Sequence, residues 1–459
     1  MAPSYAPEVV GAGVGRSGSR RVLALVNTRW HNTAVPERSS PSETPSGITD
    51  EGVARLRARI GVAQPHPQPP HYRVPNEDAF LHVAEAYGDD NPLWCDPAYA
   101  TRSSWGGPIA PPPLNGGDTL IGVNEVTALD DATRALLKGD PLRGVHAFYS
   151  GSFREWWSPV RPGMDIGRRN ALVGVDDKRS DFASRAVHEW TAEVFAARDP
   201  EVALSAQYRL MVRTERTKAE ARKKYDDTEI VPYTDDELAR IDDATAREVD
   251  ARRGPEPRWW EDVGEGDAIG MLVKGPLRVT DIVCWHVGMG MGLYGVKALR
   301  LGHEQRRRVP RFFRPDDLNI PDVQQRVHWD AEWARRAGNP AIYDYGRMRE
   351  TWLVHLCTDW MGDDAWLWKL DCEFRRFNYV GDTHWMRGRV SRRYLADGDR
   401  PAVDLEIWGE NQRGEVTTPG HATILLPSRD RGPVRLPEPP GGAATCPGLL
   451  DALIERFSR

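Results

Sequence analysis

Two related segments, one in each half of the chain, differ at a position that could carry acid–base chemistry. Residues 88–94 read Gly-Asp-Asp-Asn-Pro-Leu-Trp, and in the second segment His328 stands in the place of Trp94. An imidazole accepts or donates a proton near neutral pH, whereas an indole does not. Asp322 is the nearest acidic residue upstream of His328. The pattern therefore indicates that one half has kept an acid–base chemistry that the other has given up.

Helical and strand-like segments would position these residues. Apolar residues recur at helical spacing from Asn76 to Ala86, directly before the first segment. Strand-like runs follow at residues 145–153, 170–175, 185–195 and 204–212, and a second series occupies residues 385–394, 402–411 and 417–426. Several strands after one helix predict an α+β fold, with an antiparallel sheet packed on a helix.

Changes in composition divide the chain of 459 residues into five segments. Residues 1–45 are rich in Gly, Ser, Pro and Arg, and are expected to be a disordered extension or to lie upstream of the natural start. Two globular halves are expected at residues 46–215 and 259–430, joined by a charged helical linker at 216–258 and followed by a tail at 431–459. A length of roughly 150 residues per domain agrees with two or three units.

The first segment resembles the motif of a known family. Residues 87–97, together with Gly-Gly-Pro-Ile-Ala-Pro at 106–111, resemble the Gly-Asp-x-Asn-Pro-Leu-His-x-Asp-Pro motif region of the MaoC-like dehydratases, also called (R)-specific enoyl-CoA hydratases. The first half looks most like the N-terminal dehydratase-like domain of that family. With the second half included, the resemblance covers most of residues 70–427. It implies a double hot-dog fold, in which each repeat has a central helix wrapped by an antiparallel sheet and the two repeats pack as a pseudo-dimer.

The resemblance implies reversible hydration of a trans-2-enoyl-CoA to a 3-hydroxyacyl-CoA, without a cofactor. Catalysis is expected in the second half, where His328 and Asp322 form the acid–base pair and the backbone N–H of Gly338 faces the thioester oxygen. The spacing from Asp322 to His328 is one residue longer than the family spacing. The expected substrate-binding residues are Tyr345, Gly346, Asn339, His286 and Trp329.

The corresponding first-half site is expected to be degenerate. It would consist of Asp89, Asn91 and Trp94, with Asp89 and Asn91 retained as helix-end and turn residues. Two other activities stay open on the sequence alone. The chain could be a catalytically silent acyl-thioester-binding subunit of a hydratase complex, or a hot-dog thioesterase.

Composition and charge restrict the kind of partner. The formal net charge is −6 with interspersed charges, which argues against a nucleic acid or a membrane surface. An acyl-CoA or acyl-carrier thioester is the expected substrate, and the protein is expected to form a homo-oligomer or a complex with a related hot-dog subunit. The five cysteines form no CxxC pair and no apolar run approaches the roughly 20 residues of a membrane span, which predicts a cytoplasmic protein.

Three further features of the sequence bear on binding. The 17 tryptophans could line a tunnel for a bulky acyl group, although packing in the core and between the halves is the favoured explanation for most of them. The run Arg306–Arg308 could meet the phosphates of coenzyme A or form a solvated loop. No metal set is expected, because His355 and His384 show no Cys, Asp or Glu partner at ligand spacing.

Overall fold

The computed structural model describes most of the chain beyond the N-terminal region. The described residues are 47–65, 69–114, 120–145, 147–179, 185–215, 231–290 and 299–458. The extension predicted at residues 1–45 lies outside them. Among the described residues, no helix is long and apolar enough to cross a membrane.

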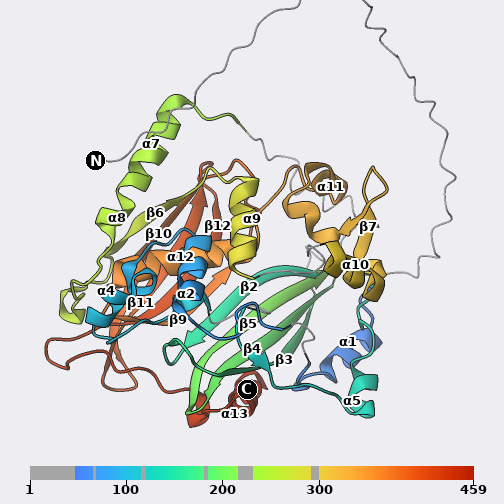
Figure 1. The fold of residues 1–459 in the computed structure, drawn as a ribbon, viewed down its shortest axis with the longest axis horizontal. Helices are drawn as coiled ribbons and strands as arrows, with labels where there is room; N and C mark the ends of the chain where they lie inside the picture. Colours follow the sequence, from blue (N-terminus) through green and yellow to red (C-terminus); the bar gives the residue numbers. More distant parts are fainter. Residues whose placement is uncertain are drawn as a thin grey trace, which may run out of the picture. The chain divides into compact units, whose positions relative to one another are not determined.

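Ten strands of the described residues form one continuous sheet (Figure 1). The first half supplies β1 (Val123–Asn124), β2 (Ala147–Trp156), β3 (Ile166–Lys178), β4 (Ala186–Arg198) and β5 (Glu201–Thr214). The second half supplies β6 (Ala268–Lys274), β9 (Trp366–Glu373), β10 (His384–Ala396), β11 (Arg400–Asn411) and β12 (Val416–Leu425). The strand order is β1-β3-β4-β5-β2-β9-β12-β11-β10-β6, and the antiparallel pairing of β2 with β9 joins the two halves. The predicted α+β class with an antiparallel sheet is confirmed.

Alternating burial explains why these segments form strands. In β11, buried Leu405 and Ile407 alternate with half-buried Glu406 and Trp408, so that one face of the strand packs on the core. Each of the seven predicted strands overlaps an observed one within a few residues. The sequence did not predict strands β6 and β9, nor the short strands β1, β7 (Phe313–Pro315) and β8 (Pro321–Val323).

Two helices lie in the main hydrophobic core. The predicted first-half helix is α2 (Glu77–Ala86), whose N-cap Asn76 accepts a hydrogen bond from the backbone N–H of Ala79. In the second half, the helix that β9 to β12 surround is α12 (Gly346–Met361). Every residue of α12 from Arg347 to Met361 is buried. The helix ends at Gly362, whose φ of +79° favours glycine.

Charged residues of α12 are buried because they find partners on other elements. Glu350 forms an ion pair with Arg154 of β2, and both side chains are almost completely buried. Arg349 lies 3.0 Å from a carboxylate oxygen of Asp344. Burial of a charge is tolerated where an opposite charge compensates it. The helix is therefore held by tertiary contacts around its whole circumference.

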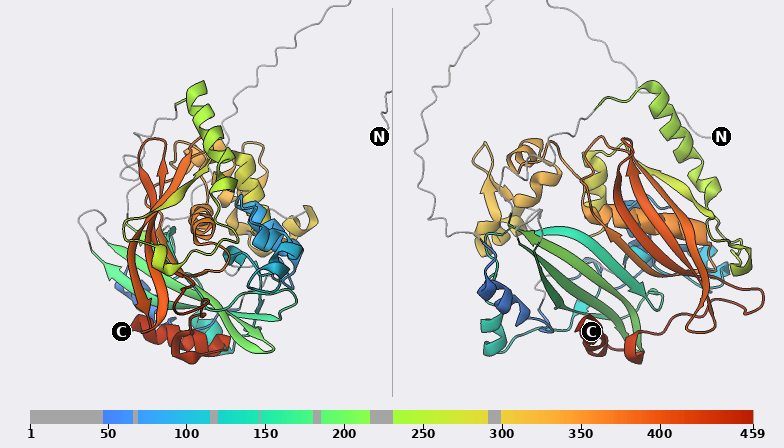
Figure 2. Two further views of the ribbon diagram at one scale, coloured as in Figure 1. Left: turned by 90° about the vertical axis from the view of Figure 1, so that its left-hand side faces the viewer. Right: turned by 180° about the vertical axis from the view of Figure 1, so that it is seen from behind.

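Shorter elements complete the fold. They are α1 (Asp50–Arg57), α3 (Pro92–Cys95), α4 (Pro97–Arg102), α5 (Asp131–Leu136), α7 (Asp235–Ala246), α8 (Glu248–Ala251), α9 (Val279–Gly288), α10 (Leu299–Arg308), α11 (Ala331–Arg336), β7 (Phe313–Pro315) and β8 (Pro321–Val323). The segment expected to be a tail contains α13 (Cys446–Ser458), which packs on β3 and β4 (Figure 2). Leu449, Leu450 and Leu453 of this helix are buried, so hydrophobic burial holds it on the sheet.

Candidate active site

Asp89 lies in the turn between α2 and α3 and is held by three hydrogen bonds. Its Oδ1 accepts from the backbone N–H of Asn91, and its Oδ2 accepts from the hydroxyl of Tyr87 and from Nε1 of Trp94, each at 2.9 Å. The side chain of Asn91 in turn caps α3 by accepting from the N–H of Leu93. Burial, together with the adjacent Asp89 carboxylate, raises the pKa of Tyr87 well above its usual value. The turn thus fixes a buried carboxylate in one orientation.

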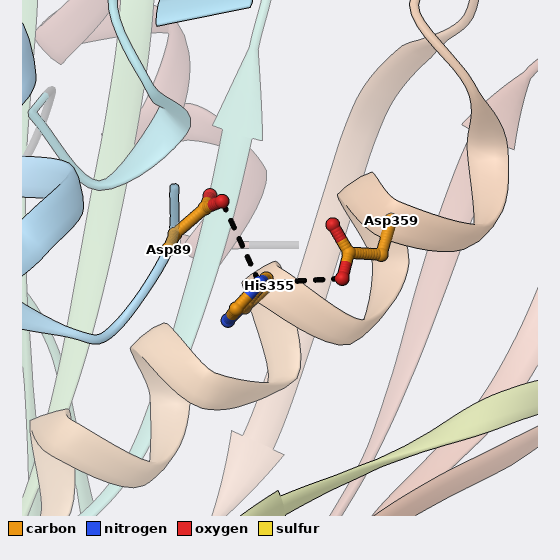
Figure 3. A group of neighbouring side chains, drawn as sticks. All are labelled: Asp89, His355 and Asp359. Carbon is orange, nitrogen blue, oxygen red and sulfur yellow. Dashed lines mark ion pairs between the residues drawn. The ribbon is translucent and has the colours of Figure 1, made fainter. Parts of the chain in front are cut away.

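A histidine from the other half of the chain faces this carboxylate (Figure 3). His355 of α12 places its Nε2 3.5 Å from Oδ1 of Asp89 and 3.3 Å from Oδ2 of Asp359, one helical turn further on. The three side chains are between 0% and 7% exposed. An imidazole between two carboxylates is a typical arrangement for moving protons.

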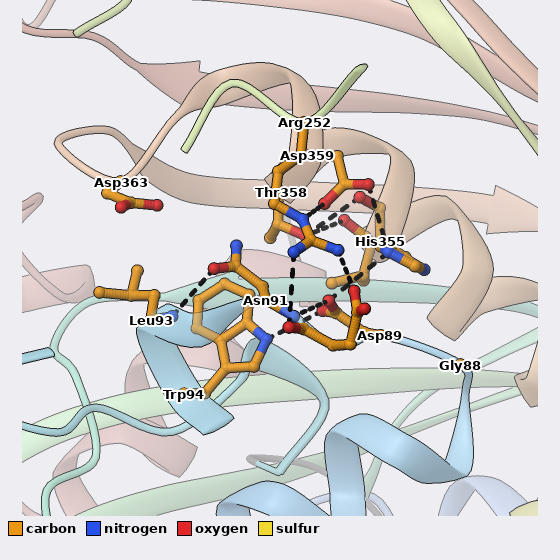
Figure 4. Close-up of polar contacts among 12 residues, drawn as sticks. Gly88, Asp89, Asn91, Leu93, Trp94, Arg252, His355, Thr358, Asp359 and Asp363 are labelled. Atoms are coloured by element: carbon orange, nitrogen blue, oxygen red, sulfur yellow. Dashed lines mark hydrogen bonds and ion pairs between the residues drawn. The ribbon is translucent and has the colours of Figure 1, made fainter. Parts of the chain in front are cut away.

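Two cations complete the surroundings of the pair formed by His355 and Asp359. Nζ of Lys274, the last residue of β6, lies 2.9 Å from Nδ1 of His355. Nε of Arg252 donates to Oδ1 of Asp359 at 3.1 Å, and the same guanidinium binds Asp90 (Figure 4). Burial acts to raise the pKa of Asp359, but the contacts with His355 and Arg252 outweigh it and the pKa is lowered. Asp359 is therefore ionised at neutral pH.

Two atoms at the centre of the group have unused hydrogen-bonding capacity. Nε2 of His355 and Oδ2 of Asp359 are buried, and neither makes a hydrogen bond with other described residues. Although they lie 3.3 Å apart, they are not aligned as donor and acceptor. Buried polar atoms are normally paired, so this geometry suits a water molecule or a substrate oxygen that contacts both atoms.

The expectation that His355 has no ligand partner was wrong, because Asp89 and Asp359 lie beside it. Ligand atoms of Asp89, His355 and Asp359 lie within 4.8 Å of one another, a distance compatible with a metal ion. Lys274 and Arg252, however, already place two cationic groups against His355 and Asp359. A divalent cation would be repelled by both, so the charges fit proton transfer better than metal binding.

An apolar pocket adjoins the site at Trp94. It is lined by Leu93, Trp94, Trp105, Ile109, Ala110, Pro112, Trp156, Ser158, Pro159, Val160, Met361, Ala365, Trp366 and Leu367. The four indole N–H groups all donate to protein oxygens, which fixes the rings. The cavity volume is about 20 Å³, close to what one water-sized or methyl-sized group needs.

Comparison with solved structures shows the fold. One structure, described as a MaoC-like dehydratase, superimposes with a TM-score of 0.52 at 17% sequence identity, covering 81% of this chain and 99% of that chain. The chain has the fold of the MaoC-like dehydratases. No family model and no curated protein matches the sequence. The resemblance seen in residues 87–97 and 106–111 is thereby confirmed at the level of the fold.

Two further structures with this fold align less closely. A putative MaoC domain protein dehydratase from Chloroflexus aurantiacus gives a TM-score of 0.47 at 13% identity, covering 85% of this chain and 100% of that chain. A MaoC-like dehydratase from Phytophthora capsici gives a TM-score of 0.42 at 10% identity, covering 78% and 94%. Neither superposition is close enough to carry an argument about the site.

Within this MaoC-like fold, four of the predicted second-half residues lie together. Nδ1 of His328 lies 2.8 Å from the carbonyl oxygen of Tyr343, and the His328 ring packs against Tyr345 with 3.9 Å between centroids. Nδ1 of His286 lies 2.9 Å from the hydroxyl of Tyr345, and Trp329 contacts the His286 ring. Burial lowers the pKa of His328 to about 4. At neutral pH His328 is therefore an uncharged ring among aromatic side chains.

Asp322 and Gly338 make other contacts. Oδ1 of Asp322 accepts from the backbone N–H of Val323 in β8, and within the described ranges no contact joins Asp322 to His328. The N–H of Gly338 donates to the carbonyl oxygen of Arg335 at the end of α11. Its φ of +95° explains the glycine, and no atom approaches within 4 Å of the Cβ position. The N–H expected to face a thioester oxygen is thus already used.

The two other predicted binding residues lie at helix ends. Asn339, just beyond α11, donates its backbone N–H to the carbonyl oxygen of Ala334. Gly346 begins α12, where a Cβ would come within 2.9 Å of the Phe374 ring. His355 and Asp359 were not predicted as site residues, although their spacing of four residues would have placed both side chains on one face of a helix.

Proposed function

We propose that the chain is a hydro-lyase that reversibly hydrates a trans-2-enoyl thioester to a 3-hydroxyacyl thioester, with His355, Asp359 and Asp89 as the site. The observation that carries this proposal is the closeness of two buried atoms, Nε2 of His355 and Oδ2 of Asp359, which lie 3.3 Å apart and make no hydrogen bond with the described residues. The MaoC-like fold supports the same reaction class. Hydration needs one group that takes a proton from water and one that delivers a proton to carbon.

The chemistry of the two groups suggests their roles. Asp359, which is ionised, takes a proton from water as the water oxygen bonds to C3 of the substrate. Nε2 of His355 delivers a proton to C2, and the Asp359 proton then returns to Nε2. The net change adds one water across the C2–C3 double bond. Asp89 keeps its carboxylate beside Nε2 and orients the ring.

The pocket beside Trp94 is proposed to hold the acyl tail. Its lining is almost entirely apolar because the four indole N–H groups point to protein acceptors. A volume of about 20 Å³ leaves room for a methyl-sized end. This favours a short acyl group over the bulky one considered from the tryptophan content.

The site also supports the expected duplication. Strands β3-β4-β5-β2 and β10-β11-β12-β9 have matching orders that meet at the β2–β9 pair. We infer two hot-dog repeats of which the first contributes Asp89 and the second contributes His355. On this proposal one composite site replaces a separate site in each half.

The test is an assay of the purified protein with trans-2-enoyl-CoAs from four to eight carbons, following loss of the enoyl absorbance. We expect turnover of the shortest substrate, and 3-hydroxyacyl-CoA as the product. Release of free coenzyme A would identify a thioesterase instead. Binding without turnover, by calorimetry, would identify a silent acyl-thioester-binding subunit.

A further inference from the structure

The ammonium group of Lys274 contacts the far side of the histidine ring. Nζ lies 2.9 Å from Nδ1 of His355 and donates to the carbonyl oxygen of Gly88 at 3.2 Å. Because Lys274 ends β6 while Gly88 precedes Asp89, this contact joins both halves behind the ring. It lies on the side opposite to the two carboxylates.

The hydrogen-bonding rules for these atoms limit the state of the ring. A lysine ammonium has donors and no acceptor, so Nδ1 must accept when it contacts a charged Lys274. The ring proton then stands on Nε2, which faces Asp89 and Asp359. This is the form of His355 that can deliver a proton towards the substrate side.

The charges around the ring show why the lysine is needed. Asp89 and Asp359 face Nε2, Lys274 faces Nδ1, and the Tyr87 ring lies with its centroid 5.9 Å from that of His355. Further groups near Lys274 or Asp359 are Arg252, Asp90 and Glu248. An imidazole beside two carboxylates favours a second proton, because opposite charges stabilise its cationic form. An ammonium at Nδ1 opposes that second proton by occupying the lone pair.

We propose that Lys274 is a positioning residue that holds His355 as the neutral Nε2–H tautomer and relays a proton to its Nδ1. The proposal rests on the proposed hydration. As Nε2 gives its proton to C2, the N–H bond of Lys274 breaks and a bond forms at Nδ1, so that the ring stays neutral. When Asp359 returns its proton to Nε2, the proton on Nδ1 goes back to Nζ. Burial lowers the pKa of Lys274, which makes the transfer of a proton from Nζ to Nδ1 easier.

The test combines the ring state of His355 with turnover. Nitrogen-15 resonances of labelled histidines, with His355 assigned by its loss in His355→Asn, report which ring nitrogens carry protons. We expect the neutral Nε2–H form in the wild-type protein and the loss of this form in Lys274→Met. Lys178→Met, at an exposed site on β3, is the matched control and should leave the resonances unchanged.

Lys274→Arg separates the two parts of the proposal. A guanidinium still donates to Nδ1 but does not give up a proton, so the Nε2–H form should persist while kcat falls about 10–100-fold with KM unchanged. An Nδ1–H ring in the wild-type protein would overturn the tautomer assignment even if Lys274→Met fails to fold. Full kcat in Lys274→Arg would overturn the relay. Absence of turnover in the wild-type protein would reject the proposed hydration. The nitrogen-15 resonances would still decide whether Lys274 holds His355 in the Nε2–H form.

Discussion

Nε2 of His355 lies 3.5 Å from Oδ1 of Asp89, although the two residues come from opposite halves of the chain. Asp89 is fixed by its own turn, and His355 is fixed by a helix buried on all sides. The carboxylate and the imidazole meet because the two halves pack together, with β2 and β9 joined in one sheet. The proposed site thus depends on the packing of one half against the other.

Replacing the histidine should remove turnover. We expect His355→Asn to lower kcat by about 10²–10⁴-fold, because the group that delivers the proton to C2 is lost. His328→Ala, assayed beside it, should keep kcat within about threefold, since its ring packs among aromatic side chains. Circular dichroism of both variants checks the fold. A large loss of turnover in His328→Ala, with normal turnover in His355→Asn, would assign catalysis to His328 instead of His355.

Asp89→Asn should reduce both turnover and stability. The amide keeps the shape but places an N–H₂ group against donors such as Nε1 of Trp94 or the N–H of Asn91. A buried donor left without an acceptor costs about 1–3 kcal/mol. Urea denaturation and steady-state kinetics measure the two effects. Asp90→Asn, at the exposed neighbouring carboxylate, is the control.

Enlarging the pocket should change the preferred chain length. Leu367→Ala removes carbon atoms from the pocket lining. The kcat/KM for a six-carbon enoyl-CoA should therefore rise relative to that for the four-carbon substrate. At about 0.8 kcal/mol per buried methylene, two extra carbons correspond to roughly tenfold in relative kcat/KM. Leu453→Ala makes a similar cavity under α13, away from the pocket, and should leave the ratio unchanged. An unchanged ratio of the two kcat/KM values in Leu367→Ala would show that this pocket does not hold the acyl tail.

Breaking the ion pair between β2 and α12 should destabilise the protein strongly. In Glu350→Gln, Arg154 keeps a buried charge without its carboxylate partner, which we expect to lower the free energy of unfolding by about 3–5 kcal/mol. Glu373→Gln disrupts the exposed pair with Arg375 and should cost under about 1 kcal/mol. Urea denaturation compares the two variants. Equal effects would show that burial of the Arg154 pair has no special energetic role.

The protein should lose stability as the pH falls, in part because of His384. Burial, followed by the charge of Arg349, lowers its pKa from the usual 6.5 to about 3 in the folded protein. Below pH 6.5 the unfolded chain binds a proton that the folded chain does not, so stability is lost as the pH falls. The contribution is about 1.4 kcal/mol per pH unit between the two pKa values. Urea curves at pH 7, 6 and 5 should show a shallower loss in His384→Asn than in the wild-type protein; parallel losses would contradict the assignment.

Local sequence patterns determined seven of the strands, the first-half turn and the fold family. The alternation in β11 and the capping side chains of Asn76 and Asn91 act over a few residues, so they can be recognised from the sequence alone. The motif at residues 88–94 likewise identified the fold that the superposition shows. These features depend on neighbours in the chain.

Only the tertiary structure decided where the candidate chemistry lies. Because α12 is buried on every side, its charged residues interrupt any apolar stripe, and the helical pattern around His355 is weak. The partners that permit this burial, Arg154 for Glu350 and Asp89 for His355, come from the other half of the chain. The register of His328 with the first-half motif is a local property, whereas the pairing of an imidazole with a carboxylate depends on which elements pack together.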